Sequence, residues 1–285
     1  TPSPPHQTQT QPPPTPPTTT TPPPPPPPPT PPAPHNLSSR LAFTLAEVLI
    51  TLGIIGVVAA MTMPALIANY QEKVTITRLK KVYSVLSQLY VSVTQEEGYP
   101  NEWDVVYNDS GSRDGTMTFY NVLKNYTKYL KICNNYDCRV EHKLLSGSYN
   151  GDSSYRVGSL PMVLADGTFL RANFTDLGGA NDCNLVRGSS DALKSVCAEL
   201  YVDINGKQFP NTFGRDTFIF YWTKYGIVPV GTKEESSHIT FGSTCSKNKS
   251  SLYSGYGCAA WVLVNENMDY MHCDDLSWWG KKTCK

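Results

Sequence analysis

The chain has 285 residues, enough for one or two domains. Its 24 lysines and arginines balance its 24 aspartates and glutamates. The composition therefore gives no basic surface typical of nucleic-acid binding and no acidic tail. The sequence also lacks the GxSxG, HExxH, P-loop and GxGxxG motifs. We expect neither a nucleic-acid-binding protein nor an enzyme.

Residues 1–37 form a low-complexity segment rich in proline and threonine, with eight consecutive prolines from Pro22 to Pro29. Such a segment cannot bury a core, so we expect polyproline II or disorder. It could serve as a spacer or recognition segment, but we favour a discarded leader or a misassigned start. The chain begins with Thr1 rather than methionine, so we expect further sequence upstream.

The next segment is apolar and long enough to cross a membrane. Residues 41–67 contain one charged side chain, Glu47, near their start, and a helix of this length spans a hydrocarbon core. A charge near the end of such a span is tolerated at the headgroups or is retained for a partner. Pro64 should kink or locally open this helix. We expect residues 43–67 to form its transmembrane half.

The sequence around Glu47 carries a resemblance to a known family. Arg40-Leu41-Ala42-Phe43-Thr44-Leu45-Ala46-Glu47 resembles the processing site of type IV prepilins and type II secretion pseudopilins. The likeness continues through Pro64 to about Glu97, although Ala42 replaces the usual glycine and Arg40 is the sole nearby cation. It implies that residues 38–42 end a leader, that a prepilin peptidase cuts between Ala42 and Phe43, and that Phe43 is then methylated. Glu47 and Pro64 would act in assembly.

Residues 68–98 should continue the helix in amphipathic form. Five apolar residues recur at steps of three and four, while polar residues occupy the other positions; the five are Leu79, Val82, Leu86, Leu89 and Val93. A globular partner should cover this stripe; a coiled coil is the alternative, but about two heptads are short for one. Gly98 and Pro100 predict the end of the helix.

Residues 99–285 should form a disulfide-rich globular head. We predict a hairpin over residues 160–174 with an Asp-Gly turn, and further strands at 200–204, 217–222, 226–230 and 260–264. Residues 119–130 have helical spacing. The expected fold is α+β, with the long helix packed on one antiparallel sheet. This layout agrees with the pilin architecture that the resemblance implies.

Eight cysteines behind a membrane-targeting segment favour disulfides in an oxidising compartment. They allow 105 pairings, of which we favour nearest neighbours in sequence: Cys133 with Cys138, Cys183 with Cys197, Cys245 with Cys258, and Cys273 with Cys284. Structural zinc is disfavoured, because there is no CxxC motif and the five histidines do not cluster.

Two further groups in the head are candidates for binding. Asp203, Asn205 and Asp216 could supply oxygen ligands to calcium, which is the one cofactor we consider; the favoured alternative is a turn stabilised by its own side chains. Trp278 and Trp279 lie inside the Cys273–Cys284 loop. They could contact a partner or a sugar at the surface, or pack beneath the loop.

The sequence thus predicts a structural subunit of a bacterial type IV pilus or type II secretion pseudopilus. Its expected partners are the prepilin peptidase, identical or related subunits, the assembly machinery and membrane lipids. It would cross the inner membrane once with its head outside the cytoplasm, then enter a periplasmic or cell-surface filament. The alternative is an uncleaved, membrane-anchored surface adhesin or binding protein.

Overall fold

The computed structural model describes residues 44–103, 113–133, 138, 140–148, 161–173, 183–249 and 251–284. The chain divides into two compact units, Thr1–Ile55 and Gly56–Lys285. In the first unit the described residues are 44–55, which belong to α1 apart from Thr44. All the strands and the remaining helices lie in the second unit.

Helix α1 runs over Leu45–Glu97 and continues through Pro64. Its five buried residues are Leu79, Val82, Leu86, Leu89 and Val93, so the predicted stripe is confirmed. The helix ends at the predicted place, because Gly98 adopts a left-handed φ of 70° that glycine tolerates without strain. By length and composition α1 could cross a membrane.

The head contains a six-stranded antiparallel sheet in sequence order. Its strands are β1 (Tyr129–Ile132), β2 (Met162–Leu164), β3 (Phe169–Asn173), β4 (Val196–Asp203), β5 (Thr217–Thr223) and β6 (Gly226–Pro229). The predicted hairpin is β2–β3, in which Val163 pairs with Phe169. The protein is therefore α+β, with a long apolar helix near its N-terminus.

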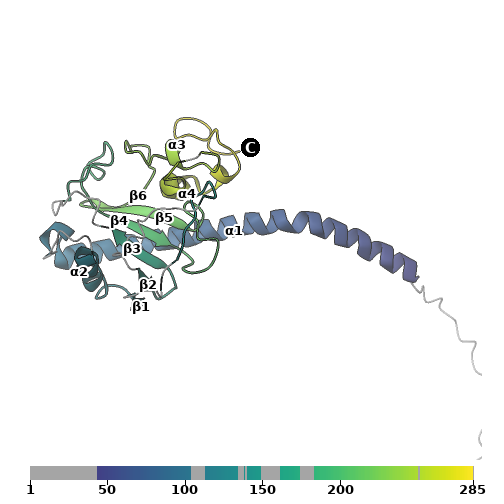
Figure 1. The fold of residues 1–285 in the computed structure, drawn as a ribbon, viewed down its shortest axis with the longest axis horizontal. Helices are drawn as coiled ribbons and strands as arrows, with labels where there is room; N and C mark the ends of the chain where they lie inside the picture. The colour runs from purple at the N-terminus through teal and green to yellow at the C-terminus, as the bar shows by residue number, and fades with distance from the viewer. Residues whose placement is uncertain are drawn as a thin grey trace, which may run out of the picture. The chain divides into compact units, whose positions relative to one another are not determined.

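Side chains alternate between the two faces of the sheet. One face carries Leu200, Phe220 and Trp222, which share a core with the α1 stripe. Two tyrosines of α1 pack on this face. The Tyr83 ring stacks on Phe220 at a centroid distance of 6.0 Å, and the Tyr90 ring lies tilted against Trp222 at 5.2 Å. Figure 1 shows α1 crossing the sheet here, with α2 (Arg113–Leu123) beside it.

The opposite face carries a second core that includes Tyr201, Ile219 and Tyr221. Chain segments rather than a long helix cover it, among them the residues around Leu144, Leu193 and Tyr256. The short helices α3 (Phe241–Thr244) and α4 (Ala259–Asn265) follow β6. Short 3-10 turns occupy Pro100–Glu102, Tyr256–Cys258 and Asp269–Met271.

Two predictions of secondary structure were wrong. Residues 260–264 belong to α4 rather than to a late strand; a short apolar run does not by itself distinguish a buried helix from a strand. The helix that contains this run has Cys258 at its N-cap and Glu266 at its C-cap, and Glu266 has a left-handed φ of 54°. Residues 119–130 are helical to Leu123 only, and Tyr129 already lies in β1.

All eight cysteines form disulfides. The bonds are Cys133–Cys138, Cys183–Cys197, Cys245–Cys258 and Cys273–Cys284. This is the nearest-neighbour pairing that the sequence favoured. Each bond closes a short loop, so together they fix local segments of the head rather than joining distant ones.

Candidate functional site

The first candidate group lies at the start of α1, where Glu47 is held by Thr44. The Thr44 backbone N–H and side-chain hydroxyl both donate to Glu47 Oε2, at 2.8 and 2.9 Å. The Glu47 backbone N–H donates back to Thr44 Oγ1 at 3.2 Å. This reciprocal arrangement is a capping box, which satisfies helix N–H groups that lack a carbonyl partner. The predicted processing residues, Ala42 and Phe43, lie outside the described residues.

The Thr44 contacts leave room for a further partner. A carboxylate offers about four acceptor positions, and Glu47 Oε2 accounts for both of the bonds that it accepts from Thr44. Glu47 can thus cap its own helix and still accept a bond from an incoming ammonium group. The capping residue and the predicted assembly residue are the same side chain.

The apolar half of α1 that follows is uncovered. Its side chains between Leu45 and Ile67 are exposed, with Ala59 alone in an intermediate class. A contiguous exposed apolar surface of this kind is unfavourable in water. It is typical of a membrane or protein interface. Pro64 also lies in this uncovered half. Because proline has no backbone N–H, one hydrogen bond of the helix is missing there.

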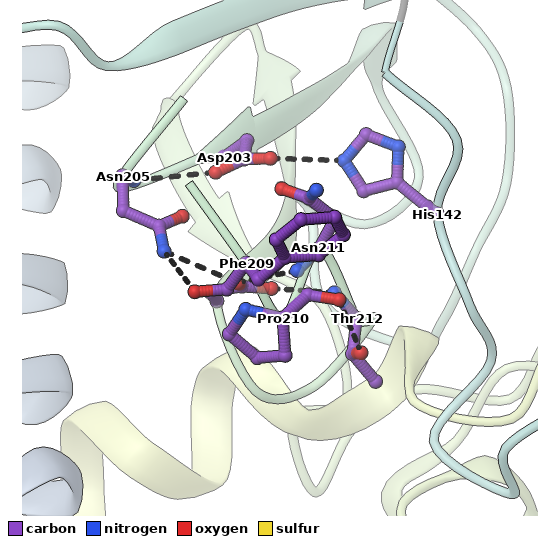
Figure 2. Close-up of polar contacts among 8 residues, drawn as sticks. His142, Asp203, Asn205, Phe209, Pro210, Asn211 and Thr212 are labelled. Carbon is purple, nitrogen blue, oxygen red and sulfur yellow. Dashed lines mark hydrogen bonds and ion pairs between the residues drawn. The ribbon is translucent and has the colours of Figure 1, made fainter. Parts of the chain in front are cut away.

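The second candidate group is the turn that joins β4 to β5, shown in Figure 2. Asp203 ends β4, and its Oδ1 accepts the Asn205 backbone N–H at 3.2 Å. Asp216 receives the backbone N–H groups of Asn211 and Thr212 at 2.7 and 2.5 Å. It also accepts a bond from the Asn205 side-chain amide at 3.2 Å. The structure thus brings the three predicted residues together.

Gly206 shows why this turn needs glycine at that position. Its φ is 64°, a left-handed value. A Cβ added there would lie 2.6 Å from the carbonyl oxygen of Gly167, in the neighbouring β2–β3 turn. Glycine is therefore required both by conformation and by the close approach of two turns.

Burial controls the electrostatics of this turn. It raises the pKa of Asp216 to about 6, with a further contribution from the nearby Asp203 carboxylate, and the N–H donors oppose this only in part. Burial likewise raises the pKa of Asp203, against the lowering effect of His142. Asp203 Oδ2 and His142 Nε2 are 3.0 Å apart, and both side chains are buried. The imidazole thus faces one of two neighbouring carboxylates.

These contacts support the structural interpretation of the turn over a calcium site. Calcium needs six to eight oxygen ligands, whereas the carboxylates of Asp203 and Asp216 already face N–H groups. Within the described residues no group of three or more His, Cys, Asp or Glu side chains is arranged to hold a metal. A calcium ion bound here would share these carboxylates with the backbone N–H groups that already donate to them.

The third candidate group is the tryptophan pair in the Cys273–Cys284 loop, and its two members differ. Trp278 packs against Trp261 and Phe241, with ring centroids 5.2 and 5.8 Å away. Its indole N–H donates to the Gly231 carbonyl at 2.9 Å. Trp279, by contrast, is 83% exposed. Packing thus accounts for Trp278, and Trp279 is the residue free to contact a partner.

Sequence reasoning missed several contacts of these groups. The capping box was readable, because Thr44-Leu45-Ala46-Glu47 has the T-x-x-E spacing of that motif. The pairing of His142 with Asp203 was not, since the two residues lie 61 positions apart. The same holds for His272 and Glu72, which are 200 positions apart yet 2.7 Å from each other.

Comparisons with known proteins give a family but no activity. No curated protein matches the chain, and no solved structure matches it. A family model matches residues 65–238, which is more than half of the chain and includes the second half of α1 and all six strands. The chain belongs to this family, which is described as a family of unknown function (DUF6613).

Proposed function

We propose that this protein is a structural subunit of a bacterial cell-envelope filament, either a type IV pilus or a type II secretion pseudopilus. The observation that carries the proposal is the division of α1 into an exposed apolar half and a half whose stripe packs on the sheet. The resemblance of Arg40–Glu47 to a prepilin processing site adds support. In this proposal the apolar half anchors the subunit in lipid and later lies in the filament core.

The proposed cycle begins with cleavage between Ala42 and Phe43 by a prepilin peptidase, followed by methylation of the new amine. The span then holds the subunit in the inner membrane, with the head outside the cytoplasm. An assembly machine extracts it, and the apolar helices of many subunits bundle together. This transfer exchanges one apolar environment for another, so the apolar side chains need not meet water at any stage.

Glu47 would determine the position of one subunit along the next. In a dry helical bundle its carboxylate would be costly unless paired, and the N-terminal amine of Phe43 on a neighbouring subunit would supply the opposite charge. A subunit shifted along its neighbour would leave both charges unpaired. The contacts with Thr44 keep the Glu47 carboxylate at the start of the helix, where such an amine would arrive.

The first test is the N-terminus of the protein purified from membranes, measured by intact mass and by peptide mass spectrometry. The proposal expects a chain that begins with N-methyl phenylalanine at position 43. A chain that retains Arg40-Leu41-Ala42 and the proline segment would contradict it. That result would favour the alternative described below.

A second test separates the two roles of Glu47. Glu47→Ala should leave membrane insertion intact but prevent incorporation into filaments, measured by shearing and quantifying assembled subunits. Glu47→Gln is the matched control, because glutamine can still complete a capping box but carries no charge. If charge pairing drives assembly, both variants fail; normal assembly of Glu47→Gln would assign the role to capping alone. Normal assembly of Glu47→Ala would refute both roles.

The alternative function is a membrane-anchored surface adhesin or binding protein that keeps its N-terminal segment. The exposed indole of Trp279 in a disulfide loop favours it, because an exposed aromatic ring is a common anchor for a ligand. This alternative does not account for the order of residues around Phe43 and Glu47. The mass measurement distinguishes the two functions directly.

A further inference from the structure

The outer end of the proposed span is marked by two residues of α1. After Glu47, the next charged side chain along the helix is Glu72, and Tyr70 lies just before it with an exposed ring. Tyrosine and tryptophan are enriched where lipid headgroups meet the hydrocarbon core. Since a helix rises 1.5 Å per residue, Tyr70 and Glu72 lie about 3 Å apart along the axis. They place the membrane surface at this level of α1.

The C-terminal loop is attached to α1 at the same level. His272 Nε2 lies 2.7 Å from Glu72 Oε1, and the next residue, Cys273, opens the disulfide loop that Cys284 closes. The pair is partly exposed, so its contribution to stability is small. Its value here is positional, because it brings the start of the loop to the predicted membrane surface.

The loop between Cys273 and Cys284 is held from within as well as by its disulfide. Trp278 is packed against Trp261 and bonded to Gly231. Lys282 Nζ donates to the carbonyl oxygens of Ser277 and Trp278, at 2.8 and 2.5 Å. The Lys281 ammonium pairs with Asp275 at 3.0 Å. The exposed Trp279 side chain therefore projects from a supported frame.

We propose that the Cys273–Cys284 loop rests on the lipid surface, with the Trp279 indole in the headgroup region. This inference rests on the proposed function, because it requires α1 to be inserted in a membrane. An indole suits that region, since its ring is apolar and its N–H can still bond to headgroups or water. The exposed ring, 83% accessible in the protein, is covered by lipid while the subunit waits in the membrane.

Charge does not drive this contact. Between Cys273 and Cys284 two aspartates balance two lysines, and Lys281 and Lys282 already have partners in the protein. A polybasic segment would bind anionic lipid preferentially; this loop should rest equally well on zwitterionic lipid. The ligand is thus the lipid interface itself rather than a particular anionic headgroup.

The test uses the full chain reconstituted at low density in phosphatidylcholine vesicles whose acyl chains carry bromine near the headgroups. Bromine quenches nearby tryptophan, so the wild-type protein should lose emission relative to unbrominated vesicles. Trp279→Phe should lose that component of the quenching. The quenching should be the same when part of the phosphatidylcholine is replaced by phosphatidylglycerol.

A matched control moves the indole to a distant part of the head. Tyr225 is 68% exposed and follows Lys224, whose carbonyl accepts a bond from Tyr90 of α1. Tyr90 lies 18 residues beyond Glu72, about 27 Å further along the helix. In the double variant Trp279→Phe, Tyr225→Trp, bromine should quench no more than in Trp279→Phe alone. Equal quenching of wild type and the double variant would overturn the proposal.

Two further outcomes are distinguished. Alkaline extraction of the same vesicles reports insertion of α1 independently; failure to insert would overturn both this inference and the membrane stage of the proposed function. Insertion without quenching of Trp279 would overturn this inference alone. If iodide reaches Trp279 in dilute vesicles but not in crowded ones, a second copy of the chain covers the indole instead, and the lipid contact is refuted.

Discussion

The two halves of α1 belong to one helix, but the apolar side chains are exposed in the first half, whereas an apolar stripe is buried in the second. From Leu45 to Ile67 the helix is predominantly apolar, with Glu47 as its one charged side chain, and it is uncovered. Beyond Tyr70 it is largely polar and buries one stripe against the sheet. The head therefore supplies the surroundings that the second half needs. The first half needs surroundings that the chain itself does not provide, which lipid or other subunits could supply.

The largest effect that tests this comparison comes from leucine truncation in each half. Leu86 is 0% exposed, whereas Leu66 is 70% exposed on the same helix. Leu86→Ala should lower the free energy of unfolding of the head by about 2–5 kcal/mol, because it removes buried methyl groups and leaves a cavity. Leu66→Ala should leave it unchanged. Denaturant unfolding of the full chain in detergent, followed by tryptophan fluorescence, measures both.

Equal losses from these two variants would contradict the difference between the two halves of α1. They would mean that the detergent-facing half contributes to folding of the head as much as the buried stripe does. A loss in Leu86→Ala alone would show that only the buried stripe contributes to folding of the head. Retention of the Leu66→Ala variant in membranes can then be measured separately from folding.

A second test uses pH, because the two regions differ in their ionisable side chains. Glu47 is the sole ionisable side chain between Leu45 and Ile67, whereas the head buries several ionisable side chains. The pKa of Asp216 is raised from 3.8 to about 6, chiefly by burial. The folded head therefore holds more protons than the unfolded chain between these values. Its unfolding free energy should fall as pH rises through this window, by up to about 3 kcal/mol from this group.

Unfolding curves at pH 4, 5, 6 and 7 measure this dependence. Burial raises the pKa of Glu235 as well, so that residue adds to the same direction. Asp216→Asn should flatten the curve, since the variant has no carboxyl to titrate at this position. A wild-type head that gains stability between pH 4 and pH 6 would contradict the assignment.

The second half of α1 could be predicted closely from the sequence. The period of Leu79, Val82, Leu86, Leu89 and Val93, together with Gly98, gave the buried face and the end of the helix. These features are local, because a helix repeats every 3.6 residues and glycine permits a left-handed stop. The β2–β3 hairpin was local in the same sense, through its Asp-Gly turn.

What the sequence did not predict depends on distant contacts. The run Ala260–Val264 forms a helix because of what surrounds it: Trp261 is fully buried and its ring stacks on Phe241 at 4.0 Å. The difference between Trp278 and Trp279 likewise depends on where Gly231, Trp261 and Phe241 lie. For the β4–β5 turn, residue types alone could not show whether Asp216 faces N–H donors or a cation.

A smaller effect is expected where α1 meets the head through exposed charges. Lys80 Nζ lies 2.6 Å from Glu266 Oε1, and both side chains are substantially exposed. Such pairs contribute about 0–1 kcal/mol because water and salt screen them. Lys80→Ala should therefore shift the unfolding free energy far less than Leu86→Ala. A loss comparable to that of Leu86→Ala would mean that charge, and not the apolar stripe, joins α1 to the head.

The smallest expected effect is that of calcium on the same head. Backbone N–H groups of Asn211 and Thr212 donate to Asp216, and Asp203 faces His142 and the Asn205 N–H. A cation would compete with these groups for the two carboxylates. The melting temperature should be the same in calcium and in EGTA. A ligand that binds only the folded state must raise it, so a rise that disappears in Asp216→Asn would place calcium in the turn. No rise in either protein would mean that the turn serves to hold β4 and β5 together. The stability of the head would then depend on protonation of Asp216 and not on bound metal.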